Sequence, residues 1–224
     1  TKLGSDPNFR PALARVAPFA VFIAFIALQP LLEARMDVRW LAALRGLCVA
    51  LLLLHFRHGY VELREAPRAS WREWAAALAI GWIVFAAWVA FDSGWAVTAT
   101  GGGFDPRRAD GSLDLILVTL RVLGLVIVVP VMEELFWRSF LMRWVDRRDF
   151  LAKDPRTVSR LAFGLSCALF ASEHALWFAG LIAGIAYGAL YMRSRNLWIP
   201  IVSHATTNGT LAIWIMATGS WHLW

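Results

Sequence analysis

Three short stretches in the second half of the sequence place carboxylate, guanidinium, imidazole and amide groups among apolar residues. Carboxylates and imidazoles can take a proton from water, and amides and imidazoles can donate hydrogen bonds to a developing oxyanion. These residue types therefore predict a hydrolytic site that needs no Ser or Cys nucleophile. The candidates are Glu133, Glu134 and Arg138 in EELFWR, His174 in FASEH, and His204 and Asn208 in HATTN.

The spacing of these residues assigns them to helix faces. Residues four apart lie on one face of a helix, so Glu134 can pair with Arg138, and His204 shares a face with Asn208. A Glu134–Arg138 ion pair would lower the cost of placing the carboxylate in an apolar setting. Glu133, about 100° further round the helix, is then the freer acid or base. The alternative for each pair is a purely structural link within or between helices.

The helices that must carry these residues are apolar enough to lie in a membrane. The 224 residues are 59% hydrophobic and 17% charged, with a mean hydropathy of +0.57. The apolar blocks are about as long as a bilayer is thick. This predicts an all-α fold, a polytopic membrane helix bundle of about seven transmembrane helices at 16–32, 38–56, 74–91, 115–142, 160–178, 179–192 and 197–217.

The boundary between the fifth and sixth spans is the least marked. No charged residue follows His174 there, and the small residues Ala179 and Gly180 suggest the turn. A re-entrant pair of segments is the alternative arrangement. Counted at about 1.5 Å per residue from one side of the membrane, Glu134, His204 and His174 lie at roughly 14, 11 and 21 Å. With ordinary helix tilts these depths are compatible with a shared site.

The distribution of positive charge predicts the orientation. With seven spans, fifteen of the 22 Lys and Arg residues fall on the side of the N-terminus and five on the other side. Cytoplasmic segments carry the excess of Lys and Arg, so the N-terminus is predicted to be cytoplasmic. Basic loops beside anionic headgroups also explain the net charge of +6 and the pI of about 10.1, so no nucleic-acid partner is predicted. The predicted location is a cell membrane, crossed several times, and the composition favours a bacterial inner membrane.

The three stretches together resemble the EExxxR, FxxxH and HxxxN signatures of the CAAX protease and bacteriocin-processing family, which includes type II CAAX prenyl protease. Each pattern alone is short, but all three occur in order and with the spacing of the family. The resemblance covers roughly residues 115–217. It implies an all-helical intramembrane endopeptidase in a single membrane domain, 1–224, in which 1–114 are scaffold spans and 115–217 carry the catalytic core.

The resemblance also implies a role for each candidate: water activation by Glu133 and His174, oxyanion or metal binding by His204 and Asn208, and orientation of Glu133 by Glu134 and Arg138. Glu133, His174 and His204 would suit a divalent metal such as zinc, with water as a fourth ligand. The HExxH arrangement of soluble zinc proteases is absent, however, so a metal-free site is equally compatible with the sequence. Glu173 lies outside the pattern and is expected to face a water-filled vestibule.

The predicted function is hydrolysis of a peptide bond in a membrane-associated or C-terminal peptide, with membrane lipid and a peptide or protein substrate as partners. One alternative is a non-catalytic membrane binding or immunity protein that retains the fold. That reading predicts decay of a motif position, and none has decayed. A transporter or channel would favour matching charged clusters in both halves, and the first three spans hold none. Neither the natural substrate nor the oligomeric state is predicted.

Overall fold

The computed structural model describes residues 8–32, 35, 37–64, 69–98 and 103–224. These residues form helices, the connections between them, and one isolated antiparallel bridge between Arg107 and Leu113. Lys2 and Arg68, two of the cations in the charge count, lie outside the described residues.

Seven helical segments occupy the seven predicted stretches, so the all-α bundle is confirmed. The fourth segment is continuous from Leu115 to Trp144 and is called the long helix below. Its parts are α5 (Leu115–Leu123), the π-helical η4 (Gly124–Val128), α6 (Val129–Glu134), the π-helical η5 (Leu135–Leu141) and α7 (Met142–Trp144). The other six are α1 (Phe9–Leu32), α2 (Val38–Phe56), α4 (Trp71–Ala90), α8 (Arg160–Ser172), α9 (Trp177–Ser194) and α10 (Trp198–Thr218).

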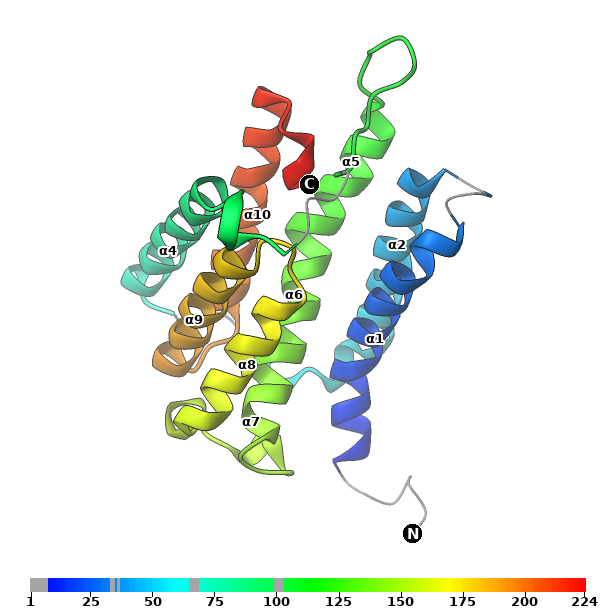
Figure 1. Cartoon of the computed structure of the whole chain (residues 1–224). Helices are drawn as coiled ribbons and strands as arrows, with labels where there is room; N and C mark the ends of the chain where they lie inside the picture. The colour runs from blue at the N-terminus through cyan, green and yellow to red at the C-terminus, as the bar shows by residue number, and fades with distance from the viewer. Residues whose placement is uncertain (1–7, 33–34, 36, 65–68, 99–102) are drawn as a thin grey trace.

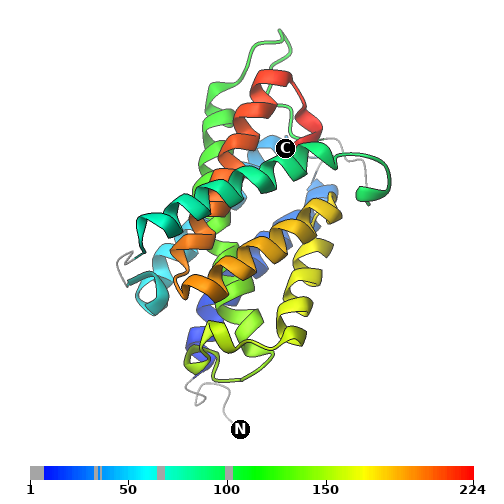
Figure 2. The same cartoon turned by 90° about the vertical axis from the view of Figure 1, so that its left-hand side faces the viewer.

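Consecutive segments alternate in direction through the bundle (Figure 1). The start of α1 lies at the same end as the described connections that follow α2, α7 and α9. In the view turned by 90°, α4 and α9 run obliquely across α10 and the long helix (Figure 2). This alternation is the arrangement that seven membrane crossings require.

Four of the segments are long and apolar enough to cross a membrane by themselves. They are α1, α4, the long helix and the stretch 38–59, which includes α2. At 13 residues, α8 is apolar but short. The remaining two, α9 and α10, have 18 and 21 residues. Their apolar stretches are diluted by glycines and by polar residues such as His204 and Asn208. These apolar helices indicate a membrane protein.

Side-chain caps explain where two of the segments begin. At α4, Ser70 accepts a hydrogen bond from the backbone N–H of Glu73, whose carboxylate accepts from the Ser70 N–H in return. This capping box starts the helix three residues before the predicted span. Asp114 caps α5 by accepting from the N–H groups of Ile116 and Leu117.

The prediction that Ala179 and Gly180 form the turn between the fifth and sixth spans is wrong. The connection comprises residues 173–176, and both small residues lie buried inside α9. Gly180 packs closely against Ala171 of α8. A Cβ added at Gly180 would lie 3.3 Å from the Cα of Ala171. Small residues between helices allow such close approach, so here they signal packing rather than a turn.

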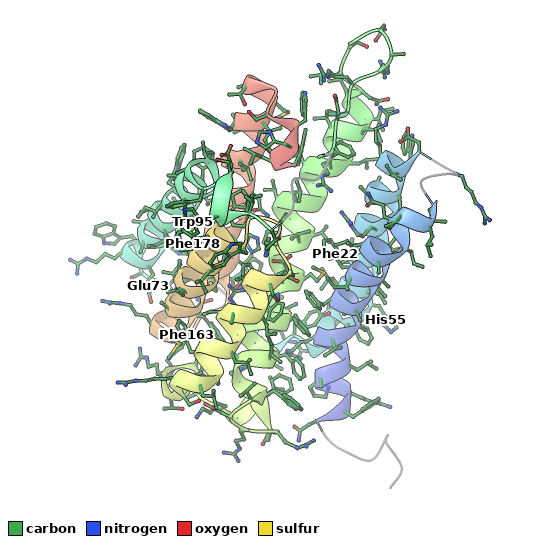
Figure 3. The ribbon with its side chains drawn as sticks, viewed as in Figure 1. Phe22, His55, Glu73, Trp95, Phe163 and Phe178 are labelled. Carbon is green, nitrogen blue, oxygen red and sulfur yellow. The ribbon has the colours of Figure 1, made fainter. Side chains whose placement is uncertain are left out.

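The same face of α9 continues the close contact with α8 at Gly184 and Gly188. A Cβ on Gly184 would lie 3.2 Å from Cys167 Cα, and one on Gly188 would lie 2.8 Å from the ring of Phe163. Figure 3 labels Phe163 on α8 beside α9. At the other end of α9, Phe178 packs with Trp95, their ring centroids 4.7 Å apart (Figure 3). This interface fixes the connection that carries His174.

A buried ionic network connects α1, the short helix α3 (Val61–Arg64) and the long helix at the end of the bundle where α1 begins. It centres on Glu62 of α3, which pairs with Arg15 of α1 at 2.5 Å and with Arg143 of the long helix at 2.7 Å. Ser139 donates a hydrogen bond to the same carboxylate. Burial alone would raise the pKa of Glu62, but these donors hold it below its ordinary value.

Candidate active site

A proline between two π-helical segments shapes the part of the long helix that carries the two carboxylates. In η4 the N–H of Val129 bonds to the carbonyl of Gly124, five residues earlier. Continuing this pattern would require the next residue, Pro130, to bond to Leu125, but proline has no N–H. The Leu125 carbonyl accepts instead from Asn208 Nδ2 at 2.8 Å. Local π geometry is frequent at functional sites, and here it anchors Asn208 of α10 to the long helix.

Glu134 is held on two sides. Its Oε2 lies 3.1 Å from Arg138 Nε, and its Oε1 accepts from His204 Nδ1 at 3.0 Å. The side chains of Glu134 and Arg138 are 0% and 2% exposed. Arg138 in turn lies over the rings of Phe170 and Tyr187, at 4.3 and 5.5 Å. The i,i+4 pair expected from the sequence is therefore present, and it also binds α10.

Glu133 has fewer partners than its neighbour. Its Oε2 is buried without a hydrogen-bond partner, and the ring nitrogen His204 Nε2 lies 3.9 Å from it. Because His204 Nδ1 donates to a carboxylate, its proton is fixed on that nitrogen in the neutral ring, leaving Nε2 on the side of Glu133. The two neighbouring carboxylates therefore differ in environment, as the helix spacing predicted.

His174 reaches the same site from the connection between α8 and α9. It lies two residues beyond the end of α8, whereas the sequence placed it inside a span. Its Nδ1 donates to the carbonyl of Phe170 at 2.8 Å, which leaves Nε2 as an acceptor. Its ring packs edge-on against Trp88 of α4, the centroids 5.4 Å apart.

Glu173 is a site residue that the sequence did not select. Its Oε1 accepts from Trp137 Nε1 at 3.0 Å. One ligand atom each from Glu133, Glu173 and His174 lie within 4.8 Å of one another. The signal that could have found it is a carboxylate next to a motif histidine at the end of an apolar helix, where an unpaired charge is costly.

These groups face one cavity of about 260 Å³ between the helices. All the predicted site residues except the paired Glu134 and Arg138 line it, together with Glu173. The spans expected to be scaffold also contribute, through Phe22 and Arg45 of the first two and Trp88 of the third. The cavity therefore combines catalytic-type polar groups with apolar walls, as ligand sites usually do.

The donor set fits a divalent cation. Two carboxylates and an imidazole are hard and borderline ligands suited to zinc. Among the described residues the compact ligand group is Glu133, Glu173 and His174. The set expected from the sequence, Glu133, His174 and His204, differs from this group in one residue. His204 lies outside the group, although its Nε2 is 3.9 Å from Glu133.

Comparison with known families adds an independent result. Residues 115–210 match the family described as type II CAAX prenyl endopeptidase Rce1-like. The matched stretch contains all three polar motifs and confirms the resemblance inferred from them. No curated protein and no solved structure matches the chain.

Proposed function

We propose, from the match to the type II CAAX prenyl endopeptidase family, that the chain is an intramembrane endopeptidase that hydrolyses a peptide bond through activated water. The observation that carries the proposal is the buried Glu133 carboxylate, which has an oxygen without a hydrogen-bond partner in the cavity shared with His174 and Asn208. A structural carboxylate would be held by an ion pair and a hydrogen bond, as Glu134 is by Arg138 and His204. An unpaired one facing a cavity is suited to taking a proton.

In this mechanism Glu133 accepts a proton from water as the water oxygen attacks the peptide carbonyl carbon. His174 Nε2 accepts a hydrogen bond from the same water and orients it. Asn208 has two N–H donors, and Leu125 uses only one of them. The second donates to the carbonyl oxygen as negative charge develops there. The C–N bond then breaks, and Glu133 returns its proton to the leaving nitrogen.

Glu134 and Arg138 act through other groups in this scheme. Glu134 holds the His204 ring, and Arg138 neutralises the Glu134 charge. His204 then keeps its Nε2 near Glu133, and as an imidazolium it would give the oxyanion a second donor. This assigns positioning roles to the pair and direct roles to Glu133, His174, His204 and Asn208.

A divalent metal such as zinc would be held by Glu133, Glu173 and His174, and His204 would lie beside it. Such an ion would lower the pKa of bound water and polarise the carbonyl. We expect Glu173→Gln to lower the metal content of the purified protein, measured by elemental analysis, if this ion is resident. Glu73→Gln, which changes a half-buried carboxylate outside the cavity, is the matched control. Equal metal content in the two variants would contradict the metal assignment.

The substrate class proposed is a membrane-associated or C-terminal peptide, cleaved in a cell membrane that the chain crosses with its N-terminus in the cytoplasm. The test compares membrane-protein cleavage products in cells that make the intact chain or Glu133→Gln. Fragments that disappear only with the variant, at equal protein level, would support the proposal. Identical fragments in both would contradict hydrolysis and favour the non-catalytic binding or immunity alternative.

A further inference from the structure

Two arginines outside the family motifs line the same cavity as Glu133. Arg45 lies seven residues into α2, and Arg121 lies six residues into α5. At about 1.5 Å per residue, both are roughly 9 to 11 Å from the same end of the bundle. They also line a smaller void between α2 and the long helix, so the two positive charges are neighbours.

Neither cation has a carboxylate partner within ion-pair distance among the residues the structure describes. Arg45 lies over the ring of Phe22, 4.6 Å from its centroid, and Arg121 lies over Phe104 at 5.1 Å. Phe22 is labelled on α1 beside the long helix in Figure 3. Aromatic faces favour a nearby cation, but they supply no hydrogen-bond acceptor in the ring plane.

Two buried donors at this end of the cavity have no hydrogen-bond partner. They are Arg121 Nε and Trp224 Nε1, and both residues line the cavity. Buried donors are normally satisfied, because an unpaired buried donor loses its hydrogen bonds to water without replacement. Like charges in an apolar segment raise the cost further, and arginines within membrane spans commonly mark substrate pathways. A single anion with several acceptor oxygens would satisfy the donors and offset the charges.

The position of these donors relative to the reacting groups restricts what the anion can be. Asn208 contacts Leu125, which lies four residues from Arg121, roughly 6 Å along the helix. Glu133 lies twelve residues from Arg121, roughly 18 Å. A peptide bond held between Glu133 and Asn208 is therefore about two to five extended residues from the arginines, at about 3.5 Å per residue.

We propose that Arg45, Arg121 and Trp224 form a subsite that binds a carboxylate of the substrate peptide, either its C-terminus or an acidic side chain. This inference rests on the proposed peptidase function and deepens it. A guanidinium binds carboxylate through charge-assisted and often paired hydrogen bonds. A peptide is favoured over a phospholipid, because a lipid with two acyl chains would compete with the substrate for a cavity of about 260 Å³.

The first experiment compares three pools of apolar peptides with the purified full-length chain in lipid nanodiscs. One pool has free C-terminal carboxylates, the second has C-terminal amides, and the third has amides with one internal Glu. We expect KM for one of the acidic pools to be roughly 10- to 100-fold below that for the plain amides. The pool that is preferred identifies the source of the carboxylate. Equal KM values for all three would overturn the subsite while leaving the peptidase function intact.

The variants test the residues themselves. Arg121→Gln and Arg45→Gln should raise KM for the preferred acidic pool more than KM for the plain amides, so that the acidic preference is lost. Arg121→Lys should retain part of the preference, and Arg121→Glu should reverse it towards peptides that contain Lys. Arg108→Gln removes an exposed cation near the same end and is the matched control. Loss of the preference in Arg108→Gln but not in Arg121→Gln would contradict the assignment.

A binding measurement separates failure of the subsite from failure of the function. Equilibrium dialysis of the same pools against the Glu133→Gln protein should show the acidic preference without cleavage. If the intact chain cleaves nothing but this preference persists, the subsite stands and hydrolysis does not. If neither is seen, both are refuted. An Arg121→Gln protein that loses a co-purifying anionic phospholipid but keeps the acid-to-amide ratio would assign the arginines to lipid and overturn the proposal.

Discussion

At the scale of single residues, the contrast between two adjacent carboxylates carries a test of folding. Glu134 lies between Arg138 and His204 and is fully buried, so its removal leaves a buried cation unpaired. We expect Glu134→Gln to lower the free energy of unfolding by about 3–5 kcal/mol, the usual effect of breaking a buried pair. Glu133→Gln should leave thermal stability nearly unchanged. Thermal unfolding of both variants in the same detergent measures this, and equal destabilisation would contradict the distinction.

Asn208 carries the prediction about charge in the transition state. Asn208→Ala removes the proposed donor and should lower kcat by roughly 10²–10³-fold, with little change in KM. Asn208→Asp should be less active still, because it places a carboxylate where negative charge develops and turns an acceptor towards the Leu125 carbonyl. Single-turnover kinetics of the two variants distinguishes these effects. An active Asn208→Asp enzyme that a chelator inhibits would instead indicate a metal at this position.

The polar residues of the motifs could be predicted as site residues, because a charged residue within an apolar stretch is costly and usually has a function. The i,i+4 rule also predicted the Glu134–Arg138 pair. Glu173 was not predicted as a site residue, because its hydrogen bond to Trp137 joins residues 36 apart in sequence. Arg121 was not predicted to line the cavity for a similar reason. Helix packing decides which face of its helix borders the cavity, and a single sequence does not show that packing.

At the scale of helices, Pro130 supports a prediction about the geometry that holds Asn208. Pro130→Ala restores an N–H that can compete with Asn208 for the Leu125 carbonyl. The helix should gain stability, since an interior proline costs about 3 kcal/mol, while kcat should fall because the amide loses its anchor. Pro30→Ala, in the exposed part of α1, is the matched control and should not change kcat. The test measures the melting temperature and kcat of Pro130→Ala together. A rise in both would contradict the prediction that stability is gained at the expense of kcat.

The network around Glu62 predicts how stability depends on pH. The pKa of Glu62 is held below its ordinary value of 4.5, so the charged form is favoured in the folded protein. The resulting stability is fully present above pH 4.5 and is lost as pH falls through the folded pKa. Glu62→Gln should therefore melt earlier than the intact chain at pH 7, and the difference should shrink on acidification. Thermal melts across this range test it, with Glu73→Gln, a half-buried carboxylate outside this network, as control, which should show a smaller difference.

The lengths of the apolar stretches predicted the helices, but they did not predict where α8 ends and α9 begins. Ala179 and Gly180 have the composition of a turn, and only the close approach of Ala171 shows that they pack inside a helix. The true connection at 173–176 contains neither Gly nor Pro. Its position reflects the placement of His174 over Trp88 from a distant helix. Long-range contacts of this kind leave no local signal in the sequence.

At the scale of the whole molecule, the two halves of the chain build one cavity. The family match covers only residues 115–210, yet Phe22, Arg45 and Trp88 complete the walls. Helices α4 and α10 are also tied directly, since Thr207 donates to the Gly81 carbonyl at 2.9 Å and accepts from Tyr187 at 2.7 Å. The first three spans therefore do more than support the half that carries the motifs, because they supply side chains that line the same cavity.

The alternation of the seven segments makes the orientation in the membrane testable. Residues 145–159 lie at the end where α1 begins, and the loop 103–114 lies at the opposite end (Figure 1). Because Lys and Arg are concentrated at the first end, we expect it to face the cytoplasm. In a background with Cys48 and Cys167 replaced by Ala, a cysteine at Arg148 should react with a membrane-impermeant maleimide only after the cells are opened, and one at Asp110 should react in intact cells. Both positions are exposed, so neither result would depend on local unfolding. Reaction of both from the same side would require an even number of spans between them and would contradict the bundle, whereas the reversed pattern would retain the bundle and invert its orientation.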